Sequence, residues 1–211
     1  MRVEEGQETD GRRVRGARTR QAILGRAARL ASAEGLEAVS LQRLAGDLGI
    51  SKSGLFAHFG SKEELHLATV DEAARIFTDE VMRPGLAPPA GVGRIWALCE
   101  AYLSYIERDV FPGGCFFEAA LAEFDSRPGP VRERILQYRD YWSASLVRAI
   151  REAQAAGEVR EDADAEQLGW ELACLLDGVN RMHLAHPDRG AADRARRAIE
   201  DRLGTVSTRS G

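Results

Sequence analysis

Apolar residues recur at the spacing of an α-helix through most of the chain. From residue 17 they lie three or four positions apart as far as Gly35, a residue suited to end a helix. A second helix is predicted between Ser40, a favourable N-cap residue, and Gly49, because leucine and alanine repeat on one face between them. Residues 1–16 have no such periodicity and are predicted to form a flexible arm.

A short third helix is predicted to begin at Ser51 and to end at Gly60. Its apolar side chains are expected in the core: Leu55, Phe56 or Phe59. Ser61 and Glu64 then form a capping box, in which the two side chains bond backbone N–H groups at the start of a helix. This fourth helix is expected to end at about Arg83, because a proline follows.

The rest of the chain is also predicted to be helical. A linker is expected at 84–93, where prolines and glycines gather. Further helices are expected near 94–108, 115–124, 131–156, 163–186 and 190–203. Since no strand pattern is present, the predicted fold class is all-α, with about nine helices.

Composition supports a helical protein. Alanine occurs 32 times, against 26 for valine, isoleucine and threonine together. No apolar run approaches the roughly 20 residues of a membrane span, and the N-terminus lacks the apolar region of a secretory signal. Cys99, Cys115 and Cys174 are too far apart to indicate a disulfide framework or a zinc cluster. We therefore expect a soluble cytoplasmic protein without a membrane partner, metal or cofactor.

Charge is unevenly distributed along the chain. The net charge is −4, yet residues 12–60 carry nine basic groups against three acidic ones. A basic N-terminal part on an acidic body indicates a polyanionic partner for that part, although a solvated helix face would look similar. The first arginines are expected to contact phosphates or a minor groove, or else to form a solubilising tail: Arg12, Arg13, Arg15 and Arg18.

The segment 41–59 has the pattern of a helix-turn-helix. A helix with an apolar face is followed by a tight turn at Gly49, where a Cβ would clash, and by a helix that begins at a serine. The solvent-side residues of this second helix suit a DNA major groove because they are small or carry donors: Lys52, Ser53, Gly54 and His58. The chain's two lysines, Lys52 and Lys62, each follow an N-cap serine, where helix dipole and free N–H groups favour a phosphate.

The segment 18–66 reads RTRQAILGRAARLASAEGLEAVSLQRLAGDLGISKSGLFAHFGSKEELH. It resembles, without gaps, the N-terminal DNA-binding domain of TetR-family transcriptional regulators. The resemblance implies a homodimeric repressor with a three-helix DNA-binding domain. It also implies a C-terminal domain of about six helices that dimerises and binds a small-molecule inducer, although the C-terminal two-thirds carries no comparable resemblance.

The resemblance also implies which residues contact DNA. The start of the second helix would contact the backbone and flanking bases through Ser40, Gln42 and Arg43. The recognition helix would contribute Ser51, Lys52, Ser53, Gly54, Phe56 and His58, and the fourth helix would bind a phosphate through Lys62. Where the family usually has a tyrosine that reaches a phosphate, this chain has Phe56. A phenylalanine cannot donate that hydrogen bond, so it would pack or contact a thymine methyl instead.

Residues of the later helices are candidates for ligand contact. They are Trp96, Phe116, Phe117, Tyr138, Trp142, Trp170, Cys174 and Asp177. Aromatic residues at helical spacing are also ordinary core residues, so each has two interpretations. Asp177, Asn180 and His183 recur on one face of an otherwise apolar helix. Because buried polar groups need partners, they are expected to pair across a dimer interface or, alternatively, to orient a ligand.

These predictions combine into one organisation. Residues 1–16 are a flexible basic arm, 17–62 a helix-turn-helix DNA-binding domain, and 63–211 a ligand-binding and dimerisation domain that pairs through helices at about 163–186 and 190–203. The expected function is sequence-specific binding to double-stranded DNA, as a repressor that a small-molecule effector releases from a palindromic operator. The alternatives are a protein-interaction module and a helical enzyme. The chain carries no G-x-S-x-G, Walker A or H-E-x-x-H motif for the latter.

Overall fold

The computed structural model describes residues 4–56 and 58–208, with side chains from residue 16 onward except those of Lys52 and Asp188. Within these residues the regular structure is helical, apart from one isolated bridge between Val159 and Ser207. The α-helices are α1 (Glu4–Glu34), α2 (Leu41–Leu48), α3 (Lys52–Phe56), α4 (Lys62–Phe77), α5 (Arg83–Gly85), α6 (Val92–Glu107), α7 (Phe116–Phe124), α8 (Pro130–Ala155), α9 (Ala165–Ala185) and α10 (Ala191–Val206). Short 3₁₀ helices lie at Leu36–Ala38 and Pro187–Arg189, and a π-helical segment at Thr78–Met82.

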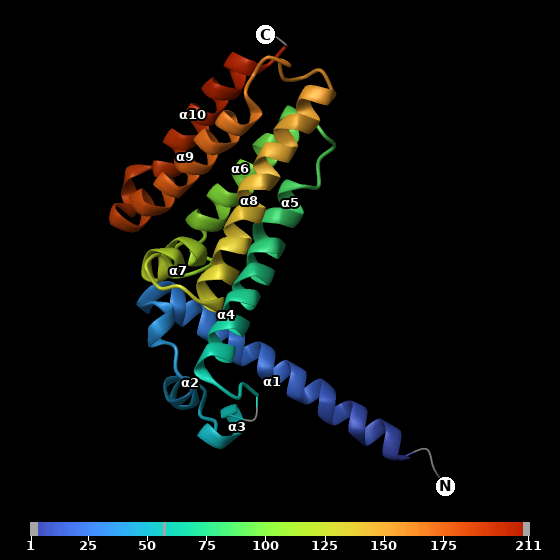
Figure 1. Cartoon of the computed structure of the whole chain (residues 1–211), viewed down its shortest axis with the longest axis vertical. Helices are drawn as coiled ribbons and strands as arrows, with labels where there is room; N and C mark the ends of the chain where they lie inside the picture. Colours follow the sequence, from blue (N-terminus) through green and yellow to red (C-terminus); the bar gives the residue numbers. More distant parts are fainter. Residues whose placement is uncertain (1–3, 57, 209–211) are drawn as a thin grey trace.

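The helices form two parts that one long helix joins (Figure 1). The head (residues 17–60) contains the C-terminal half of α1 with α2 and α3, and the body (residues 86–208) contains α6 to α10. The linking helix (residues 62–85) consists of α4, the π-helical segment and α5, and it runs from the head into the body (Figure 1). This arrangement confirms the predicted all-α fold with an N-terminal helix-turn-helix.

The first helix is longer than the sequence pattern predicts. Residues 4–16 continue α1 as regular helix, and this end of α1 extends away from the rest of the molecule (Figure 1). The prediction of an arm without regular structure therefore differs from the structure over these residues. The polar composition of this stretch explains the difference, because a helix can extend into solvent without any apolar face to mark it.

Serine caps fix the starts of α2 in the head and of α4 in the linking helix. The Ser40 hydroxyl accepts a hydrogen bond from the Arg43 amide at 3.2 Å, and the Ser61 hydroxyl accepts one from the Glu64 amide at 3.1 Å. Gly49 ends α2 with a φ of 64°, which explains the need for glycine at the turn. The head core comprises Ile23, Leu36, Leu44, Leu55 and Phe59, each at most 2% exposed.

The body is built around an aromatic cluster that the linking helix enters. Phe77 of α4 meets Trp142 edge-to-face at a centroid distance of 5.4 Å, and Tyr105 at 5.6 Å. Tyr102 stacks on Trp142 at 5.9 Å, with an angle of 16° between their planes. Such pairs contribute about 0.5–1.5 kcal/mol each beyond the area they bury. The linking helix is therefore firmly anchored in the body at Phe77.

The linking helix does not end before Pro84, as the sequence predicts, but continues to Gly85. A proline lacks the N–H that bonds to residue i−4 in an α-helix. Here the preceding residues, Thr78–Met82, are π-helical, so the regular bonding pattern has already changed before Pro84 is reached.

A second connection between head and body lies at the C-terminal end of α7. The Glu123 carboxylate accepts hydrogen bonds from the Leu36 amide at 2.6 Å and the Glu37 amide at 2.9 Å. Gly35 has a φ of 91°, and a Cβ there would lie 3.0 Å from a Glu123 carboxylate oxygen. Gly113 lies directly against the backbone of α1, where a Cβ would overlap the Ser32 carbonyl. These close contacts hold the head against the loop and helix that follow α6.

Candidate DNA interface and ligand cavity

The turn between α2 and α3 presents polar residues on the outside of the head. At the start of α2, Gln42 and Arg43 are exposed, and Ser40 is half-buried because its hydroxyl caps the helix. In α3, the Ser51 hydroxyl accepts a hydrogen bond from the Gly54 amide at 3.2 Å. The predicted recognition residues Ser51, Ser53, Gly54 and Phe56 are exposed, and His58 is half-buried. The side chain of Lys52 lies outside the described residues.

The apolar residues of this segment divide between core and surface. Leu55 is fully buried and Phe59 is 2% exposed, as expected for residues that hold α3 against the head. Phe56 is 48% exposed, so it does not serve as a core residue of α3. An exposed aromatic ring beside small polar residues is available for an apolar contact outside the chain.

Three basic side chains predicted to contact DNA are exposed on the head and its junction with α4. Arg43 pairs with Glu34 at 3.0 Å and with Asp47 at 3.6 Å. Lys62 donates to the Glu37 carboxylate at 2.7 Å, and this contact lowers the pKa of Glu37. Arg18 is exposed on α1. Exposed ion pairs contribute only about 0–1 kcal/mol, so phosphate oxygens can replace these carboxylates at little cost.

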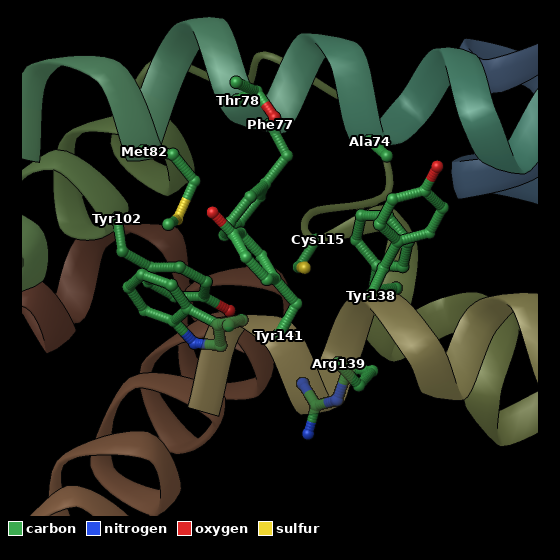
Figure 2. A pocket seen from close by; sticks show the side chains of 11 residues that line it. Ala74, Phe77, Thr78, Met82, Tyr102, Cys115, Tyr138, Arg139 and Tyr141 are labelled. Atoms are coloured by element: carbon green, nitrogen blue, oxygen red, sulfur yellow. The ribbon is translucent and has the colours of Figure 1, made fainter. Parts of the chain in front are cut away.

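A cavity of about 30 Å³ lies in the body where the linking helix meets α6, α7 and α8 (Figure 2). Its lining consists of Ala74, Phe77, Thr78, Met82, Tyr102, Cys115, Phe117, Tyr138, Arg139, Tyr141 and Trp142. Figure 2 shows Phe77, Tyr102 and Cys115 directed into a common space, with Arg139 at its edge. Aromatic rings and one thiol make this interior largely apolar.

Only part of the predicted ligand set lines this cavity. Phe117, Tyr138 and Trp142 do. The others lie elsewhere: Phe116 is buried in the core, Trp96 is half-buried against it, and Trp170 and Cys174 are exposed on α9. The spacing of aromatic residues cannot separate these cases, because it shows that a residue faces inward but not which helices meet there.

Asp177 does not line the cavity, but it forms an ion pair with Arg139, which does. The Arg139 guanidinium donates to Asp177 at 3.2 and 2.9 Å and pairs with Glu118, and Arg181 lies 3.7 Å from Glu118. Burial and the nearby Asp177 raise the pKa of Glu118. Burial alone would lower the pKa of Arg139, but Asp177 and Glu118 outweigh it and raise that pKa. The charge of Arg139 is therefore already neutralised within the chain.

The polar residues of α9 have partners within the same chain, which corrects the prediction that they pair across a dimer. Asn180 is buried and its side-chain oxygen accepts a hydrogen bond from the Cys115 amide at 2.8 Å. Asp177 pairs with Arg139, and the His183 ring lies 3.2 Å from the Asp109 carboxylate. Asn180 and His183 instead position the start of α7 and the loop before it, and Asp177 holds Arg139 of α8.

Half of the cavity residues beyond the predicted set come from the linking helix. Ala74, Phe77, Thr78 and Met82 belong to a helix that the sequence assigns to the connection with the head. In the sequence, their position is indicated by the apolar face of residues 70–82, which continues past the part of the helix that packs in the head. Tyr102 is one more aromatic residue at helical spacing, and Cys115 follows a glycine pair.

The linking helix connects the two candidate sites. At its N-terminal end, the His66 ring contacts the Val39 carbonyl at 3.0 Å inside the head, and Lys62 lies on the surface beside it. Its other end carries Phe77 and Thr78 in the cavity wall. Fifteen helical steps of 1.5 Å place Lys62 about 22 Å from Phe77 along the axis.

A groove of about 660 Å³ runs between α9 and α10 on the outside of the body. Its lining is mostly apolar and includes Cys174, Val179, Met182 and Ala198. Nearby, Trp170 is 63% and Met182 50% exposed. Large exposed apolar side chains on a helix that borders an apolar groove are typical of a surface that binds protein. In the described part of the chain no helix is both long and apolar enough to cross a membrane.

A helix-turn-helix head joined by one helix to a body with an aromatic cavity defines a DNA-binding regulator with a ligand-binding domain. Two family models match the chain. "Bacterial regulatory proteins, tetR family" matches residues 23–69, and "Tetracyclin repressor-like, C-terminal domain" matches residues 91–199. The chain therefore belongs to the TetR family of transcriptional regulators, which are DNA-binding proteins and not enzymes.

Known proteins agree with this assignment. The transcriptional regulator AcuR of Cereibacter sphaeroides is 24% identical over 152 residues, which cover 67% of this chain and 68% of AcuR. A TetR regulator from Chloroflexus aurantiacus is 26% identical with a TM-score of 0.84, and the match covers 92% of this chain and 98% of that chain. A regulator from Saccharomonospora viridis, solved in complex with choline, is 24% identical with a TM-score of 0.73, over 92% and 100% of the chains.

Proposed function

We propose that this protein is a dimeric repressor that a small molecule releases from a palindromic operator in the bacterial cytoplasm. One observation carries the proposal: a continuous helix extends from the helix-turn-helix to the wall of a cavity in the body. A change at the cavity can therefore alter the position of the head.

The residues proposed to contact DNA follow the exposed face of the head. Arg43, Lys62 and Arg18 would bind phosphates, with Ser40 and Gln42 at the start of α2. The recognition helix would enter the major groove with Ser51, Lys52, Ser53, Gly54, Phe56 and His58. The domain limits proposed for this function are 17–62 for DNA binding and 63–211 for ligand binding and dimerisation, with 1–16 as a basic arm.

The proposed dimer forms through α9 and α10. The apolar groove between these helices and the exposure of Trp170 and Met182 support an interface there. Two helices from each subunit would form a four-helix bundle. The two recognition helices would then contact half-sites about 34–36 Å apart, which predicts a nearly palindromic operator.

The proposed release mechanism acts on the linking helix. A cavity of about 30 Å³ holds little more than a water molecule, so a larger ligand must displace part of the wall. Phe77, Thr78 and Met82 belong to the linking helix and its π-helical segment, an irregularity that helices often carry at functional positions. A ligand that binds more tightly when this helix is in a different position shifts the protein toward that conformation. DNA affinity then falls by at most the ratio of the ligand's affinities for the two conformations.

The test is selection of bound sequences from random duplex DNA, followed by anisotropy titrations with the selected duplex at several salt concentrations. We expect enrichment of a near-palindrome. Lys62→Ala should reduce the slope of log K against log salt by about one unit per half-site. Arg83→Ala removes an exposed cation at the far end of the linking helix and should leave the slope unchanged. Selection without any enriched motif would instead support the protein-interaction module.

A further inference from the structure

Buried polar groups without a partner lie beside and within the cavity. Among the described side chains these are the hydroxyls of Tyr102 and Tyr105 and the indole N–H of Trp142. The three residues are 1%, 1% and 4% exposed, respectively. A buried polar group without a hydrogen bond costs about 1–3 kcal/mol, so a native protein retains one only for a reason. Tyr102 and Trp142 line the cavity, whereas Tyr105 does not.

The groups without a partner on the two lining residues, Tyr102 and Trp142, are neutral donors. An indole N–H can only donate, and a tyrosine hydroxyl without an acceptor keeps its proton free to donate. Burial raises the pKa of Tyr102 well above its ordinary value, and burial also raises the pKa of the Cys115 thiol, so both groups stay protonated. The thiol is itself only a weak acceptor. The cavity therefore offers donors, and the side-chain acceptor beside the Tyr102 hydroxyl, the Cys115 thiol, is a weak one.

The charges around the cavity exclude a strong site for an anion. Arg139 is the cationic residue of the lining, and Glu118 and Asp177 already neutralise it. A buried carboxylate on a ligand would lose its hydration without gaining an unpaired cation. A quaternary ammonium ion would be attracted to the aromatic faces, but it would leave the indole N–H and the hydroxyl without an acceptor.

We infer, building on the proposed ligand control, that the effector is a small neutral molecule with a carbonyl-type hydrogen-bond acceptor. Its oxygen accepts from the Tyr102 hydroxyl and the Trp142 indole, whose rings stack 5.9 Å apart. Its hydrocarbon part packs on Phe77 and Met82. The cavity has about 30 Å³, whereas an apolar cavity of about 150 Å³ admits benzene, so entry displaces these two side chains of the linking helix.

The experiment uses the full-length protein with three probes of similar size: 2-pentanone, pentanoate and choline. Affinity is measured by calorimetry, and the Trp142 indole proton is followed by NMR after assignment with Trp142→Phe. We expect 2-pentanone to bind most tightly and to shift this proton downfield. Tyr102→Phe should weaken its binding about fivefold to tenfold, as expected for the loss of one hydrogen bond.

Tyr105→Phe is the matched control, because it removes a buried hydroxyl without a partner that lies outside the cavity. It should leave ketone affinity unchanged, and both variants should fold, since the side-chain contact that each hydroxyl makes, with the Cys115 thiol, is weak. The inference is overturned if none of the probes binds, if pentanoate or choline binds more tightly than 2-pentanone, or if Tyr102→Phe has no effect. Operator binding is measured in parallel. A ketone that binds at Trp142 without changing DNA affinity would refute ligand control while leaving the site assignment intact.

Discussion

The connection between Glu123 and the head makes a quantitative prediction. The two carboxylate oxygens of Glu123 accept separately, one from the Leu36 amide and one from the Glu37 amide, so in Glu123→Gln one oxygen still accepts while the NH₂ group cannot. A hydrogen bond to a charged group contributes about 1.5–3 kcal/mol, and Glu123 is half-buried, so we expect a loss of about 2 kcal/mol. For a chain of this size that corresponds to a decrease in Tm of about 4–8 °C.

The assay combines thermal unfolding with hydrogen exchange of a peptide that covers residues 35–39. Exchange there should become faster in Glu123→Gln, because one of the two protected amides loses its acceptor and the other loses a charged one. Asp125→Asn is the matched control: it removes the same charge from the end of α7, and Asp125 is exposed. If Glu123→Gln unfolds at the wild-type temperature and exchanges at the wild-type rate, the junction between α7 and the head does not stabilise the protein.

Three further predictions concern the head and the dimer. Glu37→Gln removes the carboxylate that competes for Lys62, so operator affinity measured by anisotropy should rise about twofold to fivefold, and an unchanged affinity would contradict the competition. Burial lowers the pKa of His66 below its ordinary value of 6.5, so the unfolded chain takes up the proton first and stability falls as pH decreases below 6.5. The slope is at most about 1.4 kcal/mol per pH unit, and His66→Gln should flatten the denaturation profile between pH 7.5 and 5.5. Trp170→Glu places a charge on the apolar face of α9 and should convert the proposed dimer to monomers in sedimentation equilibrium, whereas a stable dimer would exclude that face.

Local signals in the sequence predict most of the fold. The serine caps at Ser40 and Ser61 and the turn at Gly49 lie where the pattern places them, because each acts on backbone groups within three residues. The helices of the body begin and end within a few residues of their predicted limits for the same reason. Two places are exceptions. At the start of α1 no apolar face marks the helix, and before Pro84 a π-helical segment changes the hydrogen-bonding pattern.

The cavity could not be predicted in the same way. Its walls combine residues from the linking helix, α6, α7 and α8, and their meeting depends on helix packing that a periodic pattern does not specify. Glu123 gives no local signal either, since its partners lie 87 and 86 positions earlier in the chain. The sequence therefore predicts which residues face inward, but not which of them surround a common space.

Helix α7 gives the proposed ligand control a second route beside the linking helix. Its N-terminal end contributes Cys115 and Phe117 to the cavity, and Glu123 near its other end holds the head. Six helical steps separate Phe117 from Glu123, about 9 Å of rigid helix. A ligand that displaces both Phe77 and Phe117 would therefore act on the head through two helices at once. Allosteric coupling is typically worth 1–3 kcal/mol, so removing one route with Glu123→Gln should reduce, but not abolish, the effect of a bound ligand on operator affinity.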